Sequence, residues 1–160
     1  MLIVPPQVPP AGSIAYTALA ATPASDYLPG VAQSGAVSTY TTQVGHYIQF
    51  GKLVFFWGKA VVNNAGAVVA GNPVVVNLPT GVAARVDQTN YVVGTASLYD
   101  LSATIMYKGH VVLFGASSVV FFPSTDASVD ATNFHLGAKA FTAALATGDI
   151  IVFSGMYEAA

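Results

Sequence analysis

The chain has no cysteine, which excludes disulfides and thiolate metal sites. Charged residues make up 8% of its 160 residues, against roughly 25% in an average soluble domain. A net charge of −2 provides no basic face, so we expect no nucleic-acid partner. Long apolar runs are also missing. Gly, Pro, Asn or Ser interrupts each run before the ~20 apolar residues of a spanning helix, so we expect no membrane insertion.

Catalytic and metal-binding patterns are missing too. The three histidines, His46, His110 and His135, lie in strand-like sequence without a nearby carboxylate, and no H-x-H pair occurs. Asp126 and Asp130 lie in PSTDASVD, whose spacing lacks the regular acidic ligands of a calcium loop. There is no G-x-S-x-G, no phosphate-binding P-loop and no G-x-G-x-x-G. We therefore expect no enzymatic activity, no catalytic residue, no cofactor and no metal site.

Apolar residues are abundant, at 54% of the chain. A monomer of this mass exposes roughly 7,500 Å², so five basic and seven acidic residues leave on the order of one charge per 600 Å². One interpretation is a low-charge monomer kept soluble by Ser, Thr, Asn and Gly. The composition favours an obligate assembly that covers much of the apolar surface.

Short strands separated by turn residues run through most of the chain, with no alternation of helix and strand. This pattern predicts an all-β fold with mostly antiparallel pairing, and the strand count fits a jelly-roll-like β-sandwich. We expect a bulge at Gly45 and a hairpin turn at Lys108-Gly109, while Lys139–Ala146 could be a helix or a strand. The predicted strands are Tyr40–Gln49, Leu53–Val62, Ala67–Ala70, Pro73–Leu78, Tyr91–Leu98, Ala103–Lys108, His110–Phe114, Val119–Phe122, Phe134–Ala138 and Asp149–Glu158.

The stretch Tyr40–Leu78 is β-rich and apolar on consecutive residues, with two lysines as its only charges. A sheet that is apolar on both faces must be covered on both faces. We therefore expect at least one sheet face to pack against another subunit, with Phe55, Phe56 and Trp57 near its centre. Neighbours in a strand point to opposite faces, so half of these side chains should face the monomer's core.

Residues 1–39 differ in composition from the rest, and we predict two parts: an extended arm and loop over 1–39, and a β-sandwich domain over 40–160. MLIVPPQVPPAG is typical of an extended polyproline-like arm with an apolar tip. The arm could pack on its own domain. The favoured alternative is that it grips a neighbouring subunit, which adds Leu2, Ile3 and Val4 to the predicted assembly interface.

Two stretches resemble a known group of proteins. STYTTQVGHYIQFGKLVFFWGKAVVNNAGAVVAGNPVVVNLP and the C-terminal GDIIVFSGMYEA are similar to strands of small β-sandwich domains in bacteriophage structural proteins. The resemblance covers about residues 38–158. It implies a virion structural protein, commonly a homotrimer, with a jelly-roll or tumour-necrosis-factor-like sandwich. The chain lacks the shaft repeats of long tail fibres.

Two functions follow as expectations. In the first, a trimeric capsid cement (decoration) protein docks on the major capsid protein at the particle surface and stabilises the head shell. In the second, a tail-fibre or tail-tip protein contacts a host surface receptor through the loops Gly81–Asn90 and Pro123–Asn133, near Tyr91, Tyr99 and Phe134. A soluble lectin is a third class, which fits the sandwich but not an apolar outer face.

Overall fold

The computed structural model describes residues 24–124 and 143–160. Within these ranges the chain forms strands and one short 3-10 helix, Val86–Gln88, and no α-helix, which confirms the predicted all-β class. The strands are β1 (Ser25–Tyr27), β2 (Val31–Gln33), β3 (Gly35–Ala36), β4 (Thr39–Phe50), β5 (Leu53–Asn64), β6 (Val74–Asn77), β7 (Val92–Asp100), β8 (Ile105–Leu113), β9 (Ser118–Ser124) and β10 (Ile150–Glu158).

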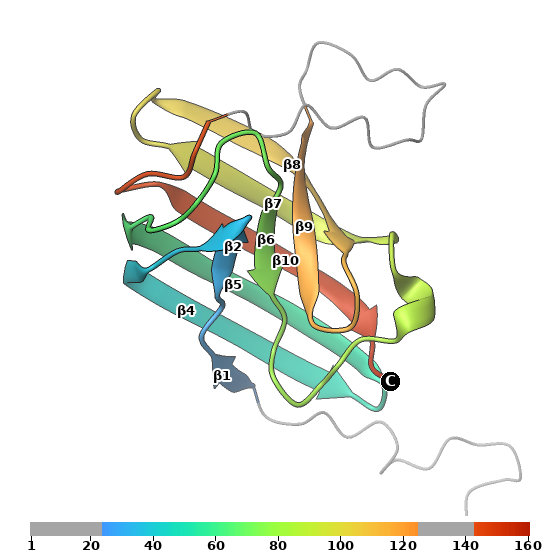
Figure 1. Cartoon of the computed structure of the whole chain (residues 1–160). Coiled ribbons are helices and arrows are strands. Elements are labelled where there is room, and N and C mark those ends of the chain that lie inside the picture. The colour runs from blue at the N-terminus through green and yellow to red at the C-terminus, as the bar shows by residue number, and fades with distance from the viewer. Residues whose placement is uncertain (1–23, 125–142) are drawn as a thin grey trace, which may run out of the picture.

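All ten strands join one sheet in the order β1-β4-β5-β10-β7-β8-β9-β6-β2-β3. Every pairing in it is antiparallel, as the sequence predicts. The sheet curls over on itself, so that β6 and β9 cross steeply over the long strands β5, β10 and β7 (Figure 1). We call β1, β4, β5, β10, β7 and β8 the back layer, and β9, β6, β2 and β3 the front layer.

The hydrophobic core fills the space between the two layers. Along β5, exposed and buried residues alternate from Leu53 to Ala60, which is the pattern of a strand with one covered face. The Phe56 ring is at the core, with its centroid 5.7 Å from that of Tyr157 and 6.3 Å from that of Phe153. Phe121 comes from the front layer and is also buried.

The C-terminal strand β10 lies between β5 and β7, at the centre of the back layer. Its register places Ser154 opposite both Trp57 on β5 and Thr95 on β7. The β4–β5 hairpin turns at Gly51-Lys52, where Gly51 has a φ of 58° that suits glycine. These registers fix which side chains share the outer face of the back layer.

Part of the predicted arm and loop over residues 1–39 is described, and it pairs with the sheet. Residues 1–23 lie outside the described residues, but β1 pairs with β4 and β2 pairs with β6. The Tyr40 hydroxyl accepts a hydrogen bond from the Val31 amide at 2.7 Å, which ties the second strand to the fourth. Strands of two or three residues are too short to give a periodic pattern, so the sequence did not reveal them.

Two glycine predictions are wrong, for a common reason. Gly109 makes no turn, because β8 runs unbroken through it. A Cβ there would lie 1.9 Å from the Phe122 carbonyl oxygen, so glycine lets the backbones of β8 and β9 approach. Gly45 makes no bulge and pairs with Gly58, while the Tyr27 ring covers it. The β4 irregularity lies at Thr39–Thr42 instead.

Three further predictions concern loops. Ala67–Ala70 forms turn and loop structure rather than a strand. The predicted strand Phe134–Ala138 lies outside the described residues. Of Lys139–Ala146, only residues 143–146 are described, and they form neither a helix nor a strand.

Candidate functional site

The outer face of the back layer points away from the core, and no other part of the described chain covers it. Its side chains come from alternate positions of β4, β5, β10, β7 and β8. Among them Phe55 and Trp57 are each 38% exposed, whereas Phe56 between them is 1% exposed. This contrast within three consecutive residues shows how the strand pleat divides the aromatic cluster between core and surface.

Apolar side chains gather at the end of this face nearest the β4–β5 turn. In register, Ile48 lies opposite Phe55, and Phe55 lies opposite Met156 on β10. The Phe50 and Phe55 rings meet edge to face at a centroid distance of 6.0 Å. We call this surface the apolar patch; it consists of Ile48, Phe50, Leu53, Phe55, Trp57 and Met156.

The apolar patch has the size of an interface core. Five of its six residues are large and 38–52% exposed, so at roughly 150–250 Å² each they leave on the order of 450 Å² of apolar surface exposed. A standard interface buries about 800 Å² per partner, of which about 450–520 Å² is apolar. The patch supplies that apolar share without help from other surfaces. It also falls in the range where the largest patch of a monomer is often functional.

The residues that the sequence singled out fall into three groups. Phe55 and Trp57 lie in the apolar patch. Phe56 packs in the core, which removes it from the predicted assembly interface. Leu2, Ile3 and Val4 lie outside the described residues, and their role stays a prediction.

A histidine and a carboxylate border the patch. His46 Nδ1 lies 2.6 Å from Asp26 Oδ1, and the His46 ring lies 5.6 Å from that of Trp57. Asp26 is on β1, so the pairing of β1 with β4 brings this carboxylate to His46. The sequence alone does not reveal this contact, because Asp26 and His46 are 20 residues apart and no motif links them.

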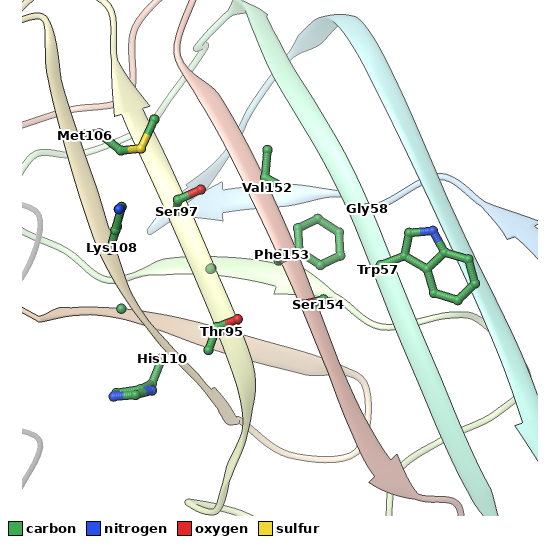
Figure 2. A pocket seen from close by; sticks show the side chains of 12 residues that line it. Trp57, Gly58, Thr95, Ser97, Met106, Lys108, His110, Val152, Phe153 and Ser154 are labelled. Carbon is green, nitrogen blue, oxygen red and sulfur yellow. The ribbon is translucent and has the colours of Figure 1, made fainter.

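The other half of the outer face holds an open hollow of about 550 Å³. Short side chains form its floor: Thr95 and Ser97 on β7, and Ser154 on β10. Longer side chains rise on both sides (Figure 2), with Trp57 on β5 and the row Met106, Lys108 and His110 on β8. The Trp57 ring leans away from β10, which widens the hollow on that side (Figure 2).

Two buried carboxylates accept hydrogen bonds from nearby turns of the chain. Asp149 accepts hydrogen bonds from the amides of Leu101 and Ala146, at 3.0 and 2.8 Å. Asp100 accepts them from the Ser102 hydroxyl and the Ala103 amide. Burial raises the pKa of Asp149, whereas the Ser102 hydrogen bond lowers the pKa of Asp100. Both lie where chain turns meet strands, a position where aspartates commonly bond nearby backbone.

Other kinds of site are not evident in the described part of the chain. Within residues 24–124 and 143–160, no group of three or more His, Cys, Asp or Glu side chains could hold a metal ion. No helix in those ranges is long and apolar enough to cross a membrane. The outer face is therefore the feature of the described chain that most requires a functional explanation.

Compared with protein-family models, curated proteins and solved structures, the chain matches none of them.

Proposed function

We propose that this chain is a non-enzymatic structural protein that assembles through the apolar patch. The observation that carries the proposal is the 38% exposure of Phe55 and Trp57 on a face that also holds Phe50, Leu53 and Met156. Exposed aromatic side chains with apolar neighbours are the usual centre of a protein interface. The scarcity of charge in the sequence supports the same function, since few charged groups would need desolvation.

The charges beside the patch favour one geometry of assembly. Lys59 and Lys108 both project from the outer face, and both are exposed. A symmetric face-to-face dimer would bring lysines from the two copies toward each other, which is unfavourable. Packing the patch against a different surface of the next copy avoids this, and such a head-to-tail contact forms a ring when its rotation closes. We propose the homotrimer that the phage resemblance implies.

The resemblance extends the proposal to a bacteriophage capsid cement protein on the head surface. The two crossing layers of the curled sheet are compatible with a variant of the jelly-roll-like sandwich expected for such a domain. The trimer would bind major-capsid subunits only in the assembled shell and so stabilise the shell by mass action. The arm, with Leu2, Ile3 and Val4, would add three weak contacts per trimer and increase avidity.

The assembly proposal is tested by the mass of the purified full chain in solution, measured by light scattering across a concentration series. The expected species is a trimer, three times the 16.4 kDa chain. Phe55→Gln should shift it toward monomer. Phe114→Gln is the matched control, because Phe114 is 60% exposed but lies outside the patch. A monomeric wild type at all concentrations would refute the proposal, and a stable dimer would refute the trimer.

The alternative function is a tail-tip protein that contacts a host receptor. The hollow favours it, because an open recess with hydroxyl and cationic side chains suits a polar ligand rather than a packed subunit. Copy number per particle separates the two functions: hundreds for cement, and a handful to tens for a tail protein. An intermediate copy number that is found on heads from which the tails have been removed would still support the cement function.

A further inference from the structure

The hollow on the outer face has a defined chemical pattern, given by two rows of side chains that run across the strands. One row is Trp57, Ser154, Thr95 and His110. The next is Lys59, Val152, Ser97 and Lys108. Each row spans three strand spacings, or about 14 Å. That width accommodates one or two sugar rings lying flat on the sheet.

The lining combines three kinds of group. Thr95, Ser97 and Ser154 offer hydroxyls that both donate and accept hydrogen bonds. Val152 is 45% exposed and gives an apolar surface between them. Lys108 and His110 stand along one side (Figure 2), and Lys59 ends the second row on the opposite side. Among the described residues the lining includes no carboxylate, and the charged side chains at the hollow are those of Lys108 and, beside it, Lys59.

We propose that this hollow binds an acidic saccharide, a sugar that carries a carboxylate or sulfate group. Lys108 pairs with the anionic group in a charge-assisted hydrogen bond. The three floor hydroxyls bond to the sugar hydroxyls, and a C–H face of the ring lies on Val152 and the base of Trp57. An acidic sugar presents an anionic group, several hydroxyls and an apolar C–H face together, whereas most other ligands present one or two of these.

Other ligand classes fit less well. A peptide that adds a strand needs a free sheet edge, and this hollow lies over β10 and β7 in the middle of the back layer. A nucleic acid needs a long basic surface, which a chain of net charge −2 does not provide. A packed protein segment would leave the serine and threonine hydroxyls without partners unless it supplied polar groups.

The inference deepens the tail-tip alternative and rests on it for a biological role, but its test does not require a virion. The purified full chain is applied to an array of uronate-containing, sialylated and sulfated oligosaccharides and their neutral counterparts. We expect the chain to be retained on the acidic oligosaccharides and little on the neutral ones. Comparing sialylated with sulfated oligosaccharides separates recognition of a carboxylate from recognition of a sulfate. A chain that binds sugars but is present in hundreds of copies per head would keep this inference and refute the tail-tip role.

Three variants make the test specific to the hollow. Lys108→Gln removes the charge, and Ser97→Tyr fills the floor; each should weaken binding about tenfold or more. Lys52→Gln is the matched control, because Lys52 is an exposed lysine at the β4–β5 turn, and its affinity should equal wild type. Trp57 is the chain's single tryptophan, so its fluorescence reports saturation with sialyllactose against lactose and shows that each variant is folded. Failure of the wild type to bind any acidic oligosaccharide overturns the inference, as does wild-type affinity in both hollow variants.

Discussion

Phe55 and Phe56 are adjacent residues of one type on opposite faces of β5, so truncating each one separates folding from assembly. Phe56 is buried against Phe153 and Tyr157. Phe56→Ala should therefore lower the free energy of unfolding by about 3–5 kcal/mol, the usual cost of emptying a core aromatic site. Phe55 is 38% exposed, and its main ring contact is the edge-to-face pair with Phe50. Phe55→Ala should cost the monomer about 1–1.5 kcal/mol.

The two variants should rank the other way when association is measured: Phe55→Ala should weaken it more than Phe56→Ala. If Phe55 is a central contact of the patch, its loss should weaken association by about 2 kcal/mol, roughly 30-fold. The folded fraction of Phe56→Ala should still associate, because its outer face is unchanged. Urea unfolding at several protein concentrations gives both quantities, since the stability of an oligomer rises with concentration and that of a monomer does not. A larger loss of monomer stability for Phe55→Ala than for Phe56→Ala would refute the register of β5, because a slip of one residue exchanges the faces.

Four other substitutions test the described fold. Gln33 is fully buried and bonds to the carbonyls of Asn72 and Ala143 and to the Leu145 amide, so Gln33→Leu should lower the free energy of unfolding by about 2–4 kcal/mol in urea. Gly109→Ala should cost about 3 kcal/mol or more, because its Cβ would meet backbone rather than a movable side chain; a cost under about 1 kcal/mol would contradict the close approach of β8 and β9. The Tyr27 hydroxyl is buried without a hydrogen-bond partner among the described residues, whereas that of Tyr157 donates to a carbonyl at 2.7 Å. Tyr27→Phe should therefore be neutral or stabilising, and Tyr157→Phe destabilising by about 1 kcal/mol. Burial raises the pKa of both tyrosines, so their contribution to stability is complete below the unfolded pKa near 10 and is lost as pH rises above it; a stability that stays flat from pH 9 to 12 would contradict this.

The sequence predicted the long strands well, because each has enough residues for its composition to be informative. In the first eight residues of Leu53–Asn64, surface and core positions alternate without exception. The turn at Gly51-Lys52 follows from the glycine between two apolar runs. The sequence could not distinguish a glycine that turns the chain from one that admits a neighbouring backbone. Gly109 is the second kind, and only the position of β9 reveals it.

Only part of the apolar patch could be predicted from the sequence. Alternation along β5 alone places Phe55 and Trp57 on one face and Phe56 on the other. It does not say which face is the core, and it cannot add Ile48 or Met156, which join the patch through pairings with β4 and β10. The hollow could not be predicted either, because it too depends on which strands pair. Its floor and sides come from strands far apart in sequence, brought side by side because β10 inserts between β5 and β7.

The central claim is that the apolar patch, rather than another surface, holds the copies together. Trp57 lies in the patch and is the chain's single tryptophan, so collisional quenching of its fluorescence by acrylamide reports directly on that surface. We expect easy quenching at concentrations where the chain is monomeric, and several-fold protection where light scattering shows the trimer. A trimer whose Trp57 is quenched as readily as that of the monomer would contradict the claim.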